Sequence, residues 1–259
     1  MSRTAPGIGD ITGKRLLIIG ASRGIGLAIA TRAAQLGAVV HLTARSAQAA
    51  ADTAAALAAT HGAQVAGHGL DIAAADATAR LGAVLLAAGD PDALIYNAGV
   101  SPVYARPEHI SDAVFDHLVA VNLRGPFLAA RAFGAQCLAQ GRPGAIVFIA
   151  SVASLIGTPR VAAYSATKAG VLGLTRSLAV DWAADGIRVN AVAPGWVATD
   201  MTQGLRDNPH LHDSLTGRVP MGRFAQPDEI ADVALFLASD SARYVTGSVY
   251  SVDGGLLAG

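Results

Sequence analysis

The residue pair with the most specific chemistry is Tyr164 and Lys168, which lie four positions apart in the run Tyr-Ser-Ala-Thr-Lys. On a helix, positions i and i+4 share one face, so the lysine ammonium would lie one turn from the phenol. A tyrosine has an ordinary pKa of about 10, and a nearby cation favours its ionised form. The chain has only two lysines, Lys14 and Lys168, so chance gives such a pair with a probability of about 0.04. We predict that Tyr164 is a general acid and base whose pKa Lys168 lowers; the alternative is a surface pair without function.

A second candidate site is the glycine-rich segment Gly20–Gly26, with the sequence GASRGIG. It directly follows a short apolar run and opens a helical stretch. Glycines let a backbone turn tightly and approach a pyrophosphate, and the amino end of a helix supplies N–H donors. The segment therefore favours a dinucleotide-binding loop, and the alternative is an ordinary glycine-rich turn.

The residues after the second predicted strand bear on which dinucleotide binds. Enzymes that use NAD usually place a carboxylate here, where it binds the ribose 2′-hydroxyl. This chain instead has Ala44 followed by Arg45, and Arg23 of the glycine-rich segment could reach the same place. Two guanidinium groups without an acid suit a 2′-phosphate. We therefore predict NADP(H) as the cofactor; the alternative is that Arg45 is a solvated residue at a helix start.

Apolar runs alternate with alanine-rich helical stretches along the chain and would position these groups. We predict strands at 16–19, 39–43, 65–72, 93–96, 145–150, 187–193 and 248–252. Helices are predicted after the glycine-rich segment to about residue 36, and at 47–60, 74–87, 111–140, 163–184 and 227–238. This alternation favours a parallel sheet of right-handed βαβ units. The predicted fold is α/β, a doubly wound Rossmann sheet of about seven strands with helices on both faces.

No linker or repeat divides the chain, so we assign residues 1–13 to a lead-in and residues 14–259 to one dinucleotide-binding and catalytic domain. Hydrophobic residues make up 52% and charged residues 15% of the chain, which excludes a disordered protein. The 19 basic and 19 acidic residues balance, so the charge totals do not favour binding to nucleic acid or to a membrane.

No apolar stretch approaches the roughly 18 residues of a membrane helix, and the single cysteine, Cys137, cannot form an internal disulfide. We therefore expect a cytoplasmic protein. His210 and His212 lack a further ligand pattern, so we expect no metal site.

In their order along the chain, these motifs resemble those of the short-chain dehydrogenase/reductase family from Lys14 to Gly255. The resemblance rests on Gly20, Gly24 and Gly26; on Asp71; on Asn97-Ala98-Gly99; on Asn122; on Ser151, Tyr164 and Lys168; on Pro194-Gly195 with Thr199; and on Val252-Asp253-Gly254-Gly255. It implies hydride transfer between NADP(H) and a ketone or secondary alcohol, with Asn122, Ser151, Tyr164 and Lys168 as the catalytic residues. Ser151 would donate a hydrogen bond to the carbonyl oxygen, and Asn122 would hold a water that links Lys168 to solvent.

The family resemblance also implies the binding residues. Those for the cofactor are Gly20, Ser22, Arg23, Gly24, Ile25, Gly26, Arg45, Asp71, Ile72, Asn97, Ala98, Gly99, Tyr164, Lys168, Pro194, Gly195, Val197 and Thr199. The substrate pocket would include Ser151, Val152, Trp196 and Met201, under a lid at about residues 199–226. The family further implies a homotetramer in which the helical regions 111–140 and 163–184 pair across subunits, with a homodimer as the alternative.

Two positions depart from the family pattern, which commonly has Thr where this chain has Ile19 and Asn where it has Tyr96. Both lie at the ends of adjacent predicted strands, so we expect apolar packing to replace a polar contact there. Three functions remain open: an NADP(H)-linked ketone reductase or secondary-alcohol dehydrogenase, a 3-oxoacyl-carrier-protein reductase, and a non-catalytic NADP-binding sensor.

Overall fold

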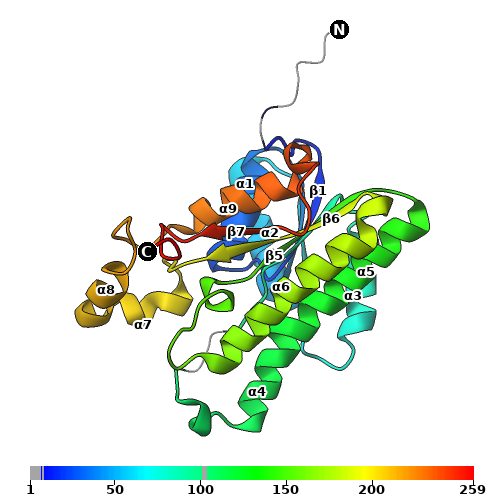
Figure 1. Ribbon diagram of the computed structural model, residues 1–259. Helices are drawn as coiled ribbons and strands as arrows, with labels where there is room; N and C mark the ends of the chain where they lie inside the picture. The colour runs from blue at the N-terminus through cyan, green and yellow to red at the C-terminus, as the bar shows by residue number, and fades with distance from the viewer. Residues whose placement is uncertain (1–6, 8, 101–103) are drawn as a thin grey trace.

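A parallel sheet forms the centre of the molecule in the computed structural model, which describes residues 7, 9–100 and 104–259 (Figure 1). The described strands pair in the order β3-β2-β1-β4-β5-β6-β7. Their bounds are β1 (Arg15–Ile19), β2 (Val39–Ala44), β3 (Val65–Gly69), β4 (Ala93–Tyr96), β5 (Gly144–Ile149), β6 (Ile187–Pro194) and β7 (Val249–Val252). The central strands read as continuous apolar runs because both faces of the sheet are covered. The predicted doubly wound Rossmann sheet is confirmed.

The helices divide between the two faces of the sheet. On one face lie α1 (Gly24–Gln35), α2 (Ala47–His61) and α9 (Pro227–Ala238), which pack into one apolar core. On the other face lie α3 (Ala77–Ala87), α4 (Asp112–Val119), α5 (Gly125–Gln140) and α6 (Ala162–Trp182). The short helices α7 (Gln203–Arg206) and α8 (Pro209–Thr216) stand beside the body near the C-terminus, within the predicted lid (Figure 1).

Two predicted elements differ from the structure in where they begin or end. The predicted strand 65–72 ends at Gly69 and the next helix begins at Ala77, because the Asp71 carboxylate accepts a hydrogen bond from the Ala73 N–H and stabilises a turn. The predicted helix 111–140 is divided into α4 and α5 by a π-helical turn, η2 (Ala120–Arg124). Ser111 caps the start of this region, as its side chain accepts a hydrogen bond from the Val114 N–H.

The strand order of the sheet reverses between β1 and β4. The chain runs outward through β2 and β3 and then returns to pair β4 against the opposite side of β1. The backbone N–H groups of Asn97 and Ala98 both donate to the Ile19 carbonyl, which closes the two strand ends onto each other. In such sheets the crevice outside the carboxyl ends of the strands, at this switch point, is where ligands bind.

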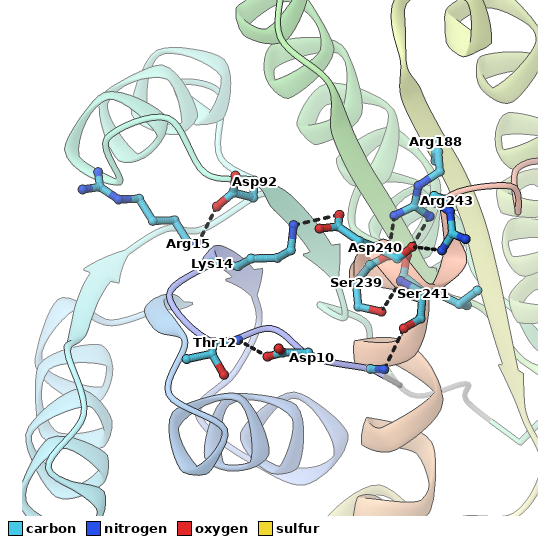
Figure 2. A network of polar contacts seen from close by, with 12 residues as sticks. Asp10, Thr12, Lys14, Arg15, Asp92, Arg188, Ser239, Asp240, Ser241 and Arg243 are labelled. Atoms are coloured by element: carbon cyan, nitrogen blue, oxygen red, sulfur yellow. Dashed lines mark hydrogen bonds and ion pairs between the residues drawn. The ribbon is translucent and has the colours of Figure 1, made fainter. Parts of the chain in front are cut away.

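Polar contacts at the opposite, amino-terminal edge hold the described part of the predicted lead-in against η6 (Asp240–Ala242), which follows α9 (Figure 2). The Gly9 N–H donates to Ser241 Oγ at 2.9 Å, and Lys14 Nζ lies 2.9 Å from Asp240 Oδ1. Residues 1–6 and 8 of the predicted lead-in lie outside the described residues.

Candidate functional site

A cavity of about 520 Å³ opens at the carboxyl ends of the strands, where the switch point predicts a ligand. The segments that follow β1, β2, β4, β5 and β6 all contribute to its wall. The wall includes these predicted cofactor residues: Gly20, Ser22, Arg23, Gly24, Ile25, Arg45, Asp71, Ile72, Asn97, Ala98, Gly99, Tyr164, Lys168, Pro194, Gly195, Val197 and Thr199. Groups more than 100 positions apart in the sequence are thus brought to one cavity.

The glycine-rich segment forms a backbone cradle at one end of this cavity. Gly20 has φ +83°, and a Cβ there would lie 2.6 Å from Ala98 Cα. Gly26 does not line the cavity but packs behind the loop, where a Cβ would collide with the Gly20 carbonyl and with Asn97 Nδ2. Asn97 Nδ2 donates to the Gly20 carbonyl at 2.6 Å and so ties the end of β4 to the loop. A backbone this open, at the amino end of α1, fits a pyrophosphate.

Two exposed guanidinium groups, those of Arg23 and Arg45, lie on the same cavity wall. Arg45 directly follows Ala44, the last residue of β2, and precedes Ser46, which caps α2 by accepting a hydrogen bond from the Ala49 N–H. This end of the cavity therefore combines two fixed positive charges with the amino end of a helix, an arrangement that suits a phosphate group.

The predicted acid and base lie on α6, with Ser151 facing them from the segment after β5. Lys168 Nζ lies 5.8 Å from the centroid of the Tyr164 ring and donates to the Ile149 carbonyl at 2.8 Å. Lys168 is only 5% exposed, and this burial lowers its pKa to about 8. Lys168 is therefore buried and Tyr164 half-buried on the cavity wall, so the two residues do not form a pair on the open surface.

The pKa of Tyr164 differs from the sequence-based expectation. Burial raises the pKa of this phenol to about 12, a hydrogen bond with Ser151 lowers it in part, and Tyr104 raises it further. The predicted lowering by Lys168 is not present in the protein chain by itself. The physical reason is that both groups lose hydration in the same apolar surroundings, so burial disfavours the charged form of each.

Asn122 lies behind the cavity and is fully buried in η2. Its side-chain Oδ1 accepts a hydrogen bond from the Val100 N–H at 2.9 Å, and its Nδ2 donates to the Val100 carbonyl at 3.3 Å. A Cβ on Gly99 would lie 3.5 Å from Asn122 Oδ1 and 3.7 Å from Lys168 Nζ, so these two side chains approach each other across Gly99. The predicted catalytic residue thus uses its amide to hold the loop after β4 next to Lys168.

The predicted substrate residues separate into two groups. Ser151 and Met201 line the cavity beside Tyr164. Val152 and Trp196 instead pack with Val219 and the C-terminal segment in a small apolar cluster, and they are not among the described residues of the cavity wall. In that cluster Val152 is buried and Trp196 half-buried, so apolar surface of both side chains is removed from water.

Trp196 also contacts the lid itself. Its ring centroid lies 6.3 Å from that of Phe224, which in turn stacks on His212 of α8 at 5.6 Å. Trp196 therefore belongs to the support of the lid rather than to the described wall of the cavity.

One residue that bears on the site was noted in the sequence only as a departure from the family pattern. Tyr96 pairs in register with Ile19, and both are buried in one apolar core, as predicted. In addition, the Tyr96 hydroxyl donates a hydrogen bond to the Val121 carbonyl at 2.8 Å, next to Asn122. The sequence feature that could have indicated this contact is a large residue with a polar tip at an otherwise apolar strand end.

Within residues 7, 9–100 and 104–259, no group of three or more His, Cys, Asp and Glu side chains is arranged to hold a metal ion. No helix in the same ranges combines the length and apolarity needed to cross a membrane.

Residues 20–257 match the family described as enoyl-(acyl carrier protein) reductase. The chain is 41% identical over 240 residues to galactitol 2-dehydrogenase (L-tagatose-forming) of Cereibacter sphaeroides, with 92% of each chain covered. It is 37% identical over 244 residues to a 3-oxoacyl-[acyl-carrier-protein] reductase of Staphylococcus aureus, covering 94% of this chain and 98% of the relative.

Among solved structures, the fold is similar to a gluconate 5-dehydrogenase from Burkholderia cenocepacia in complex with NADP and tartrate. The TM-score is 0.92 at 34% identity, covering 97% of this chain and 98% of that one. The family match, the sequence identities and the near-complete coverage of the chain all indicate the same family. The chain belongs to the short-chain dehydrogenase/reductase family of oxidoreductases.

Proposed function

We propose that the protein transfers a hydride between NADP(H) and a ketone or secondary alcohol, with Tyr164 as the general acid and base. The observation that carries the proposal is the convergence of Tyr164, Lys168 and Ser151 on the wall of a cavity that also holds the glycine cradle. NADP is bound in the gluconate 5-dehydrogenase to which the fold is similar, which supports the choice of cofactor.

Each protein group has a distinct task in this proposal. The cofactor, when bound, supplies or accepts the hydride. In the reductive direction Tyr164 donates its proton to the oxygen of the substrate, and Ser151 donates a hydrogen bond to the same oxygen, where negative charge develops. A phenol with its ordinary pKa of about 10 is already protonated at neutral pH, and burial raises that pKa further, so Tyr164 has its proton available to act as the acid. Lys168, linked to solvent by a water that Asn122 would hold, returns a proton to Tyr164.

The experiment is a screen of NADPH oxidation over ketones, sugars, steroids and acyl thioesters, repeated with NADH. Turnover of a ketone or sugar with NADPH supports the proposal. NADPH binding without turnover of any substrate would instead identify a sensor, the third function predicted from the sequence.

The preference for NADP(H) has its own test. Arg45→Asp replaces a cation with the carboxylate that suits a ribose 2′-hydroxyl, and we expect kcat/KM with NADPH to fall by roughly 10- to 100-fold, the value of one charge-assisted contact, while kcat/KM with NADH is maintained or rises. Arg32→Asp, on the exposed side of α1, is the control for charge reversal away from the cavity. It also breaks the ion pair of Arg32 with Asp232, so its thermal stability is measured alongside its kinetics. Equal efficiency of the wild-type protein with both cofactors would contradict the role of Arg23 and Arg45.

Reduction of a 3-oxoacyl carrier protein is the second candidate, and the match to the Staphylococcus aureus reductase favours it. An acidic carrier needs basic residues near the site, yet the exposed side of α5 has Arg131 as its one charged residue. We therefore expect acyl thioesters of a small thiol to react as well as the carrier-bound form. A strong preference for the carrier-bound substrate would instead make reduction of a 3-oxoacyl carrier protein the first candidate function.

We further propose a homotetramer in which α5 and α6 pair with their counterparts in a second subunit. The support is a set of exposed apolar side chains on these helices, among them Phe127 and Leu138 on α5 and Val180 on α6, which is 81% exposed. Light scattering should give four chains for the wild type and fewer for Val180→Asp. A monomeric wild type would contradict the proposal, and two chains would indicate the homodimer.

A further inference from the structure

The hydroxyl group of Tyr96 lies at the base of the turn that bears Asn122. Tyr96 is the last residue of β4, is 2% exposed, and donates its hydroxyl hydrogen to the Val121 carbonyl at 2.8 Å. Val121 is itself 7% exposed, so its carbonyl has little access to water. A buried carbonyl without a partner is costly, which makes the source of its hydrogen bond important.

The backbone of η2 cannot supply that hydrogen bond. In an α-helix the Val121 carbonyl would accept from the Gly125 N–H, but in the π-helical turn that N–H donates to Ala120 instead. The next donor in a π-helical pattern would be residue 126, which is proline and has no N–H. The Tyr96 hydroxyl therefore fills the place of a missing backbone donor.

The same proline affects the carbonyl of Asn122. Pro126 lies four positions after Asn122, so the ordinary α-helical donor to that carbonyl is absent as well. The side-chain amide of Asn122 is already occupied by Val100. Pro126 thus removes the α-helical donor to the Asn122 carbonyl, and the Asn122 side chain lies across Gly99 from Lys168.

Gly125 completes the arrangement. A Cβ at this position would collide with the Tyr96 hydroxyl oxygen and would lie 3.0 Å from Ile72 Cγ1. A glycine here leaves the space that the Tyr96 hydroxyl needs to reach Val121. The hydrogen bond from Tyr96 to the Val121 carbonyl therefore depends on residues from two elements. Tyr96 lies at a strand end, and Gly125 and Pro126 lie at a helix start.

We propose that Tyr96 is a positioning residue for the reaction, which holds the π-helical turn so that Asn122 can hold a water through which protons move between Lys168 and solvent. This inference rests on the proposed function, because it assigns Tyr96 to the proton path of that reaction. It also gives the unusual tyrosine at this strand end a task beyond packing against Ile19.

The test compares Tyr96→Phe, which removes only the hydroxyl, with wild type and with Tyr250→Phe as a matched control. Tyr250 is a partly buried tyrosine that packs on Phe236, away from the site. For Tyr96→Phe we expect kcat to fall by roughly 10- to 100-fold, the range for a small misplacement of a catalytic group. KM for NADPH should stay the same, and the solvent deuterium isotope effect on kcat should rise because proton transfer becomes slower.

A second variant that disturbs the same hydrogen bond keeps the test possible if Tyr96→Phe does not fold. Gly125→Ala displaces the Tyr96 hydroxyl while keeping the tyrosine, and it should give the same kinetic change, whereas Gly82→Ala, in open space on α3, should not. The double variant Tyr96→Phe with Gly125→Ala should lose no more activity than the worse single variant, because both changes remove one contact.

The outcomes separate this inference from the proposed function. If wild type oxidises NADPH with a ketone but Tyr96→Phe loses only thermal stability, with kcat and the isotope effect unchanged, the inference is wrong and the proposed function stands. If both variants leave every kinetic constant as in wild type, the inference is again wrong. If the wild type turns over no substrate but still binds NADPH, the proposed function is wrong, and the inference that rests on it is wrong as well.

Discussion

At the residue scale, burial sets the properties of the two titratable groups at the site. It raises the pKa of Tyr164 to about 12 and lowers that of Lys168 to about 8. Both shifts favour the neutral form, since neither group is paired with an opposite charge in the protein. Tyr164 is protonated at neutral pH, as an unshifted tyrosine would also be, while Lys168 titrates close to the pH at which an enzyme works.

Removal of the Tyr164 hydroxyl tests the acid directly. For Tyr164→Phe we expect kcat/KM to fall by at least roughly 100-fold, because general acid catalysis is lost, while NADPH still binds. Tyr244→Phe, at a fully exposed tyrosine, is the control and should match wild type. Undiminished turnover by Tyr164→Phe would exclude the mechanism.

The pH dependence follows from Lys168. A lysine is charged below its pKa and neutral above it, so the free protein loses this ammonium as the pH rises through about 8. We expect kcat/KM for reduction to fall on the alkaline side with an apparent pKa near that value, since kcat/KM reports groups of the free enzyme. A profile that stays level between pH 7 and 10 would mean that the charge of Lys168 is not needed.

At the element scale, the cofactor cradle depends on how closely β1, α1 and β4 approach one another. Asn97 ties the end of β4 to the Gly20 carbonyl, and Gly26 fits against that contact from α1. Such packing leaves no room for a side chain at Gly26, the third residue of α1. The elements themselves are stabilised by apolar burial on both faces of the sheet, so the site is held by a rigid scaffold.

Two glycine-to-alanine changes should therefore have opposite effects. Gly26→Ala introduces a methyl group into closed space, and we expect a loss of about 1–3 kcal/mol in the free energy of unfolding together with weaker NADPH binding. Gly82→Ala on α3 meets open space and removes a flexible residue from a helix, so it should stabilise by about 0.5–1 kcal/mol. Thermal melts of both variants, and titration with NADPH, make the comparison.

Equal melting temperatures for Gly26→Ala and wild type would show that the glycine-rich loop can move away from α1 and make room for the added methyl group. The close approach of α1 to the strand ends would then be incidental to cofactor binding.

At the scale of the whole molecule, contacts between distant parts of the chain close the amino-terminal edge of the sheet (Figure 2). Arg188 of β6 is partly buried and donates to the carbonyls of Leu237 and Ser239 at 2.8 and 3.0 Å. Lys14, near the N-terminus, pairs with Asp240, which is 74% exposed. The two contacts lie near each other in Figure 2 but differ in their access to water.

This difference predicts unequal effects of two similar substitutions. Arg188→Ala leaves carbonyl groups without a donor in a partly buried place, and we expect a loss of about 2–3 kcal/mol, which lowers Tm by roughly 4–10 °C. Lys14→Ala breaks an exposed ion pair and should cost less than about 1 kcal/mol, with an effect that decreases as salt is added. Thermal denaturation at low and high salt measures both, and comparable losses for the two variants would contradict this view.

The sequence by itself determined the fold class, the approximate positions of most strands and helices, and the Tyr164–Lys168 pair. It could do so because hydrophobic periodicity, glycine spacing and the four-residue interval between Tyr164 and Lys168 are local features of the chain. The other predicted residues of the cavity wall came largely from the resemblance of ordered motifs to the family. Only the tertiary structure decided that Val152 and Trp196 pack under the lid, and that burial raises rather than lowers the pKa of Tyr164. Tertiary structure alone also joined Tyr96 to the Val121 carbonyl, 25 positions away. Burial, and contacts between residues far apart in the sequence, depend on how the elements pack, and no local pattern encodes them.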